Sequence, residues 1–145
     1  MRPLVLLMAI GIAVAACGST LPLPAGTTKL GVSNGTTLTV SVYVNGVRIA
    51  DFPPGAPAPT IDPSILAPLP WRVEARSPSG RVLTSMTVEP GEVTRTTRPG
   101  GVTEYTGAMG RVDLSCGRLT IWAGDITPSG PPPPPSPGHP GDCAP

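Results

Sequence analysis

Residues 38–49 read LTVSVYVNGVRI and carry the clearest structural signal in the chain. Aliphatic side chains alternate there with polar or aromatic ones, and the aliphatic set is Leu38, Val40, Val42 and Val44. This period of two is typical of a β-strand with one buried face. The strand runs into an Asn-Gly pair at residues 45–46, the dipeptide most typical of a two-residue hairpin turn.

Pairing across this turn predicts a register. Val44 is set against Val47, and Val42 is then set against Ile49. All four side chains share one face, so the hydrophobic pattern and the turn agree.

An earlier Asn-Gly pair, at residues 34–35, predicts a different connection. A two-residue turn there would put Leu38 on the wrong face. A three-residue loop instead pairs Val32 with Leu38 and Leu30 with Val40. We therefore expect a bulged or longer hairpin loop at this position.

A second hairpin is expected after residues 52–70, whose seven prolines indicate a long connection that crosses an edge or joins two sheets. Residues 71–76 alternate in the same way as the first strand, and residues 77–80 form a Pro- and Gly-containing turn. Pairing across this turn sets Ala75 against Val82, Val73 against Thr84 and Trp71 against Met86. It also gives the hairpin one apolar face.

The remaining segments complete an all-β pattern. Residues 92–97 are mostly polar and suggest an edge strand, and residues 111–116 and 118–123 predict two more strands. We expect an antiparallel β-sandwich of about seven or eight short strands within residues 29–126. Its size suits an immunoglobulin-like sandwich.

The amino-acid composition favours some classes of protein and argues against others. The 145 residues are 39% hydrophobic and 13% charged, which favours one folded domain, while 22 prolines and 18 glycines indicate irregular segments. The formal net charge is +1 and no basic patch is visible. Nucleic-acid binding therefore has no electrostatic support.

The N-terminal segment has the features of an export signal. An uncharged apolar run, residues 4–16, follows Arg2 and would span about 20 Å as a helix, short of the ~30 Å bilayer core. The run ends in Val14, Ala15, Ala16 and Cys17.

These four residues resemble the lipobox of bacterial lipoproteins. The resemblance implies cleavage of a signal peptide, residues 1–16, and a diacylglycerol thioether on Cys17. Residues 17–28 are then a lipid anchor and tether, and the chain is membrane-anchored and extracytoplasmic, facing the periplasm or the cell surface. The alternative is an ordinary signal peptide that leaves Cys17 free.

Two cysteines remain, and we expect a Cys116–Cys143 disulfide because exported proteins fold in an oxidising compartment. The bridge closes a loop worth roughly 3.5 kcal/mol on the chain-entropy estimate. It would hold the Pro-rich tail, residues 127–145, against the domain. The proline content of this tail predicts a polyproline II conformation. A metal site that adds His139, or two free thiols, are the alternatives.

The sequence lacks the common catalytic motifs. His139 is the only histidine and lies in the Pro-rich tail, and no nucleophile elbow, phosphate loop or zinc-protease motif occurs. We expect neither enzymatic activity, nor a cofactor, nor a resident metal. The leading hypothesis is a non-catalytic envelope module with a binding or structural role; the alternatives are an accessory small-ligand or metal-binding surface protein and an enzyme.

Two aromatic residues are candidates for a binding surface. Tyr43 lies on the strand face opposite the valines, and Trp122 alternates with aliphatic residues in the last strand. If the aliphatic set faces the core, Trp122 points out of it. We expect the Pro-rich tail to cover the indole; burial by a loop or by the opposing sheet, and an open partner site, are the alternatives.

Overall fold

The computed structural model describes residues 19–22, 28–56, 59–101, 103–124 and 138–144, and these confirm the all-β class. They contain eleven strands and one short 3-10 turn, Pro63–Ile65. The first six strands are β1 (Ser19–Pro22), β2 (Lys29–Asn34), β3 (Val40–Val44), β4 (Val47–Phe52), β5 (Thr60–Ile61) and β6 (Trp71–Arg76). The other five are β7 (Val82–Val88), β8 (Thr94–Thr97), β9 (Thr103–Tyr105), β10 (Ala108–Leu114) and β11 (Gly117–Gly124).

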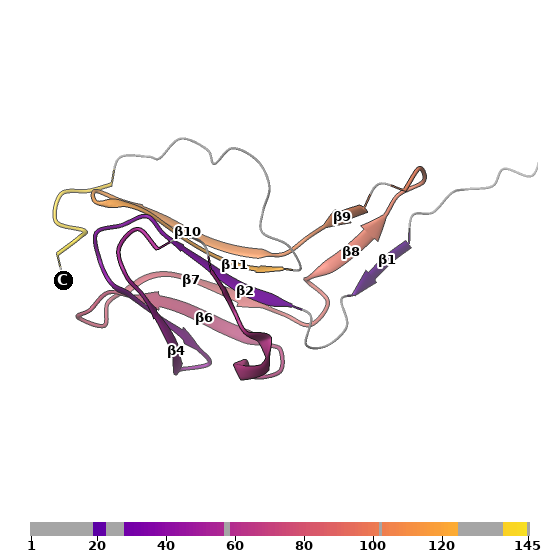
Figure 1. Ribbon diagram of the computed structural model, residues 1–145, viewed down its shortest axis with the longest axis horizontal. Coiled ribbons are helices and arrows are strands. Elements are labelled where there is room, and N and C mark those ends of the chain that lie inside the picture. The colour runs from indigo at the N-terminus through magenta and orange to yellow at the C-terminus, as the bar shows by residue number, and fades with distance from the viewer. Residues whose placement is uncertain (1–18, 23–27, 57–58, 102, 125–137, 145) are drawn as a thin grey trace, which may run out of the picture.

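Two four-stranded antiparallel sheets form the sandwich (Figure 1). Their strand orders are β4-β3-β6-β7 and β10-β11-β2-β5. The core lies between them and is built from the alternating aliphatic positions that the sequence pattern picks out. Its fully buried side chains include Leu30, Val32, Val40, Val42, Val44, Val73, Val88, Leu119 and Ile121.

The β3–β4 hairpin confirms the predicted turn and corrects part of the predicted register. Asn45 has φ 51° and Gly46 has φ 81°, as a two-residue turn of this kind requires, and Val44 pairs with Val47. An irregularity after Val42 then shifts the ladder, so that Val42 pairs with Ala50 rather than Ile49. The expectation of one common buried face was therefore wrong for Val47, which is exposed at the hairpin tip.

The β6–β7 hairpin has the predicted turn but not the predicted pairs. Ala75 pairs with Thr84 instead of Val82, and Trp71 pairs with Val88 instead of Met86. A register irregularity beside Arg76 causes the change, because it leaves an extra residue near the turn. Trp71, Val73, Ala75, Met86 and Val88 are buried on the core face.

The loop after Asn34 does not form a hairpin, so the predicted pairing of Val32 with Leu38 was wrong. β2 and β3 belong to opposite sheets, and the chain crosses the sandwich between them. Asn34 is fully buried at this crossing, and its Nδ2 donates to the carbonyls of Leu38 at 2.8 Å and Phe52 at 3.0 Å. A buried amide that satisfies loop carbonyls makes the crossing possible.

The Pro-rich connection joins the two sheets, as expected. It leaves β4 in one sheet, adds β5 to the edge of the other beside β2, and returns to β6 through a cis Leu69–Pro70 bond.

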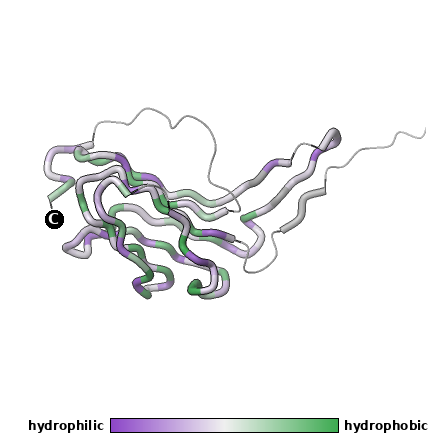
Figure 2. The backbone as a smooth tube through the Cα atoms, in the orientation of Figure 1, coloured by the Kyte–Doolittle hydropathy of each residue, from purple (hydrophilic) through white to green (hydrophobic). Residues whose placement is uncertain are grey.

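A third, three-stranded sheet projects from one end of the sandwich, in the order β1-β8-β9 (Figure 1). The expectation that residues 92–97 form an edge strand was wrong, because β8 is the central strand of this small sheet. Figure 2 shows few strongly hydrophobic residues along it. Part of the segment expected to be a tether, Ser19–Pro22, pairs with β8 here.

Candidate functional site

The outer face of the β4-β3-β6-β7 sheet carries a cluster of polar and charged side chains linked by ion pairs. Strand register aligns Ser41 with Arg76, Tyr43 with Glu74, and both with residues of β4. We call this surface the β3–β6 face, and its residues are Ser41, Tyr43, Arg48, Asp51, Arg72, Glu74 and Arg76.

Glu74 is the centre of the β3–β6 face. Its carboxylate forms ion pairs with two arginines of β6, Arg72 and Arg76, which lie two residues away on either side. Arg72 Nη2 lies 3.0 Å from Oε1, and Arg76 Nε donates to Oε2 at 3.0 Å. Glu74 is only 9% exposed as a residue, although its side chain faces away from the core. The hydrogen bond from Arg76 holds the pKa of Glu74 below its usual range.

Tyr43 is held by the same arginine. The guanidinium carbon of Arg76 lies 4.4 Å from the centroid of the Tyr43 ring, a cation–π distance. On the other side, Arg48 forms an ion pair with Asp51, which also accepts from the Ser41 hydroxyl at 2.7 Å. The hydrogen bond from Arg48 lowers the pKa of Asp51.

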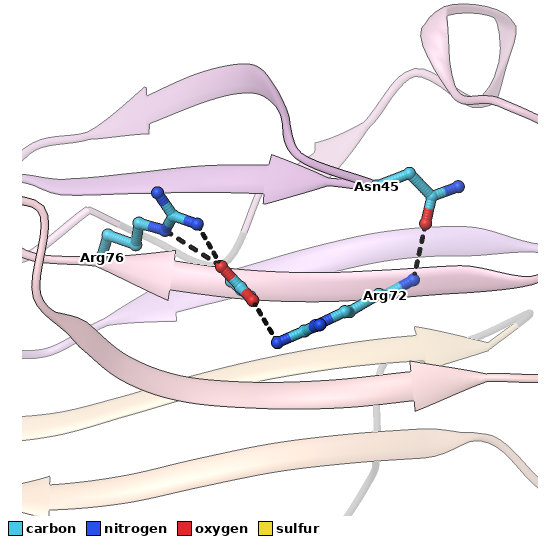
Figure 3. Close-up of polar contacts among 4 residues, drawn as sticks. Asn45, Arg72 and Arg76 are labelled. Carbon is cyan, nitrogen blue, oxygen red and sulfur yellow. Dashed lines mark hydrogen bonds and ion pairs between the residues drawn. The ribbon is translucent and has the colours of Figure 1, made fainter.

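Asn45 fixes the end of the β3–β6 face. Its Oδ1 accepts from the backbone N–H of Arg72 at 2.8 Å, and its backbone N–H donates to the Arg72 carbonyl at 2.9 Å (Figure 3). Its Nδ2 donates to the carbonyl of Pro70 at 3.1 Å. The same asparagine that makes the hairpin turn therefore anchors the start of β6. Sequence reasoning identified the turn but not this second contact.

The β3–β6 face carries more guanidinium donors than carboxylate acceptors. Three guanidinium groups stand against two carboxylates, and the carboxylates are already engaged within the face. The Arg72 side chain is 75% exposed, so it keeps free donors toward solvent. Planar guanidinium donors beside an aromatic ring suit carboxylate, phosphate or hydroxyl oxygens of a partner.

Trp122 points away from the core, as predicted, and lies over Gly31 of the neighbouring strand β2. A Cβ atom on Gly31 would lie 2.0 Å from the indole Cζ2, so the ring occupies the space that a side chain at position 31 would need. Trp122 is 4% exposed and thus presents little surface to a partner. The expected cover, residues 131–135 of the tail, lies outside the described residues.

A groove of about 500 Å³ lies where β7 and β10 meet the small sheet. Its lining residues are Ser85, Met86, Thr87, Glu92, Gly107, Ala108 and Met109. Met109 is half exposed at its rim. Sequence reasoning did not anticipate this groove, because its walls come from segments that are distant along the chain.

The C-terminal residues 138–144 confirm the predicted disulfide between Cys116 and Cys143, whose Cα atoms are 6.0 Å apart. Asp142 adds polar contacts that the sequence gave no reason to expect. Its Oδ1 accepts from the Ser115 N–H at 2.9 Å and from the Ser115 hydroxyl. These hydrogen bonds lower the pKa of Asp142.

Ser115, Asp142 and His139 share the composition of a catalytic triad but not its order. In a triad the imidazole lies between the serine and the carboxylate. Here Asp142 bonds Ser115 directly, and it accepts at 2.7 Å from the backbone N–H of His139 rather than from the ring. The arrangement holds the C-terminal loop on the β10–β11 turn.

Other expectations concern metals and membranes. Within the described ranges, no group of three or more His, Cys, Asp or Glu side chains is placed to hold a metal ion. The same part of the chain contains no helix with the length and hydropathy needed to span a bilayer. Residues 14–17, which resemble a lipobox, lie outside the described residues.

The fold therefore defines an all-β sandwich protein with a charged outer sheet face, a groove at one corner and a disulfide-fastened C-terminal loop. Compared with known proteins, the chain matches no family model, no curated protein and no solved structure.

Proposed function

We propose that the protein is a lipid-anchored, extracytoplasmic binding module without catalytic activity, and that its β3–β6 face contacts the partner. The anchor is lipid on Cys17, at the end of the signal segment. The Cys116–Cys143 bridge supports an oxidising, extracytoplasmic setting, because such bonds rarely persist in the cytoplasm.

The observation that carries the binding proposal is the held geometry of Glu74, Arg72 and Arg76. Arg76 bonds the carboxylate and stacks on Tyr43, so its orientation is fixed before any partner arrives. Fixed side chains lose less entropy on binding. Arg72 and Arg48 remain largely open to solvent and can meet oxygen atoms of a protein or glycan partner.

The anchor is tested on native protein purified from its own host. We expect the mature chain to begin at Cys17, to carry the mass of acyl chains and to partition with membranes. Substitution Cys17→Ser should abolish the added mass. Native protein with a free, unmodified Cys17 would contradict the anchor.

The binding face is tested by photo-crosslinking in intact cells. A photoreactive amino acid at Thr39, an exposed position two residues before Ser41, samples the edge of the β3–β6 face without removing any of its side chains. The same probe at Thr60 samples an exposed position on the other sheet. We expect one discrete adduct from position 39, which disappears when Arg48→Ala is added, and none from position 60. Equal patterns from both positions would refute the proposed face. A hydrolase panel on folded protein tests the absence of catalysis.

The groove favours a second candidate function, the binding of a small ligand between β7 and β10. Its volume of about 500 Å³ lies within the range of small-molecule sites. Substitution Thr87→Trp fills it, whereas Thr103→Trp adds the same side chain on the small sheet. Ligand-observed NMR with a library of sugars and amino acids should show binding that only the first variant loses. No binding to wild-type protein would argue against this candidate.

A further inference from the structure

The small sheet has one end at the sandwich and one free end. At the sandwich end, Thr94 of β8 pairs with Pro22 and its carbonyl accepts from the Thr106 N–H, and buried Val93 precedes it in the core. At the free end, Thr97 pairs with Ser19 of β1 and with Thr103 of β9. The β8–β9 turn, residues 98–101, therefore lies at the same end as Ser19.

Chain length ties the lipid site to this end. Cys17 precedes Ser19 by two residues, and two residues span at most about 7 Å. Acyl chains on Cys17 must then enter a bilayer beside Ser19, and so beside the β8–β9 turn.

The chemistry of the turn suits a headgroup layer. Gly100 and Gly101 have positive φ, and a Cβ on either would meet no atom within 4 Å, so the turn is open to its surroundings at these two positions. Arg98 is paired with Glu104 at 2.8 Å, but its side chain is 62% exposed. Glu104 balances the charge of Arg98, but an exposed guanidinium keeps donors that can bond the phosphate oxygens of lipid headgroups.

The opposite end of the long axis carries the C-terminal loop (Figure 1). That loop is fastened to the β10–β11 turn by the disulfide, and Arg81 beside the β6–β7 turn donates to the carbonyl of Asp142. Both turns therefore share the end that lies away from the small sheet.

We propose that the β8–β9 turn rests on the phospholipid headgroups of the membrane that holds the lipid on Cys17. The small sheet then separates the sandwich from the bilayer, and the disulfide-bonded end of the sandwich points away from the membrane. The inference rests on the proposed lipid anchor and adds the orientation, which the anchor alone leaves open. The β3–β6 face and the groove are then held to the side, clear of the membrane.

The test uses the lipidated full mature protein in vesicles of phosphatidylethanolamine and phosphatidylglycerol that contain a nitroxide-headgroup lipid. A bimane probe is placed at Pro99→Cys in the β8–β9 turn or at Ser79→Cys in the β6–β7 turn, both exposed positions, with the native disulfide intact. We expect the nitroxide to quench the Pro99 probe by more than half and the Ser79 probe hardly at all. The unlipidated Cys17→Ser form should show background quenching at both.

Two failures are distinguishable because the mass of each preparation is measured first. Acylated, membrane-bound protein with equal quenching at the two positions, or stronger quenching at Ser79, would overturn the orientation while the anchor stands. A mass without acyl chains would overturn the proposed anchor and the orientation with it.

Discussion

Replacing Gly31 with alanine probes the contact between β2 and the indole of Trp122. The added Cβ would lie 2.0 Å from Cζ2 and 2.1 Å from Cε2 of the ring, whereas carbon atoms pack favourably at about 3.5 Å or more. The ring must therefore move by about 1.5 Å. Trp122 is buried, so this movement disturbs its surroundings as well.

The magnitude follows from two opposing effects. Forcing extra volume into a packed site costs about 3 kcal/mol, and replacing glycine by alanine inside a strand returns about 0.5–1 kcal/mol. We expect Gly31→Ala to lower the free energy of unfolding by about 2 kcal/mol. In a Trp122→Leu background the ring is absent, and the same change should be neutral or stabilising. The coupling energy of the pair is then about 2–3 kcal/mol.

The assay is chemical denaturation of the four proteins of this cycle, followed by far-UV circular dichroism, so that the loss of a tryptophan does not affect the signal. Ser33→Ala is the matched control, because Ser33 lies on the same face of β2 and its replacement should change stability by less than about 0.5 kcal/mol. If Gly31→Ala is as stable as wild type, or costs the same without the indole, the packing argument is refuted.

Three further predictions concern other contacts. Asn34→Ala should lower the free energy of unfolding by about 3 kcal/mol in denaturant titrations, because it leaves buried carbonyls without a donor. A loss below about 1 kcal/mol would mean that the crossing between the sheets after Asn34 does not depend on this amide. The Cys116→Ser, Cys143→Ser double variant should lose about 3.5 kcal/mol, measured in the same way, and an unchanged midpoint would count against the loop-closure estimate. Because its folded-state pKa is lowered, Glu74 contributes stability above its ordinary value of 4.5, and the contribution is lost as the pH falls below that value. Thermal unfolding from about pH 7 to about pH 3 should therefore show the difference between wild type and Glu74→Gln shrinking; a difference that grows toward acid would contradict the sign.

Much of the fold could be predicted from local pattern. The alternation of Leu38, Val40, Val42 and Val44 gave the correct buried face, and Asn45 with Gly46 gave the correct turn. The period of two assigns faces reliably because successive side chains of a strand point to opposite sides. The register beyond each turn was wrong at Val42 and at Ala75, because one irregularity shifts every later pair.

The candidate site was less accessible to sequence reasoning. Tyr43 was identified as outward-facing, but no pattern in the sequence predicted that Glu74 would be nearly buried between Arg72 and Arg76. Burial of a charge depends on which side chains cover it, and these also come from neighbouring strands. The groove was missed for the same reason, since its walls meet only after folding.

By itself the sequence determined the all-β class, the two hairpin turns, the outward direction of Trp122 and the pairing of Cys116 with Cys143. The first three depend on neighbouring residues, and the pairing follows once Cys17 is expected to carry lipid. Only the tertiary structure decided that β2 and β3 part into opposite sheets at Asn34, and that β1 joins β8 in a separate sheet. Many strands of this chain share a similar hydrophobic pattern and could pair with one another, and long-range packing decides which pairs form.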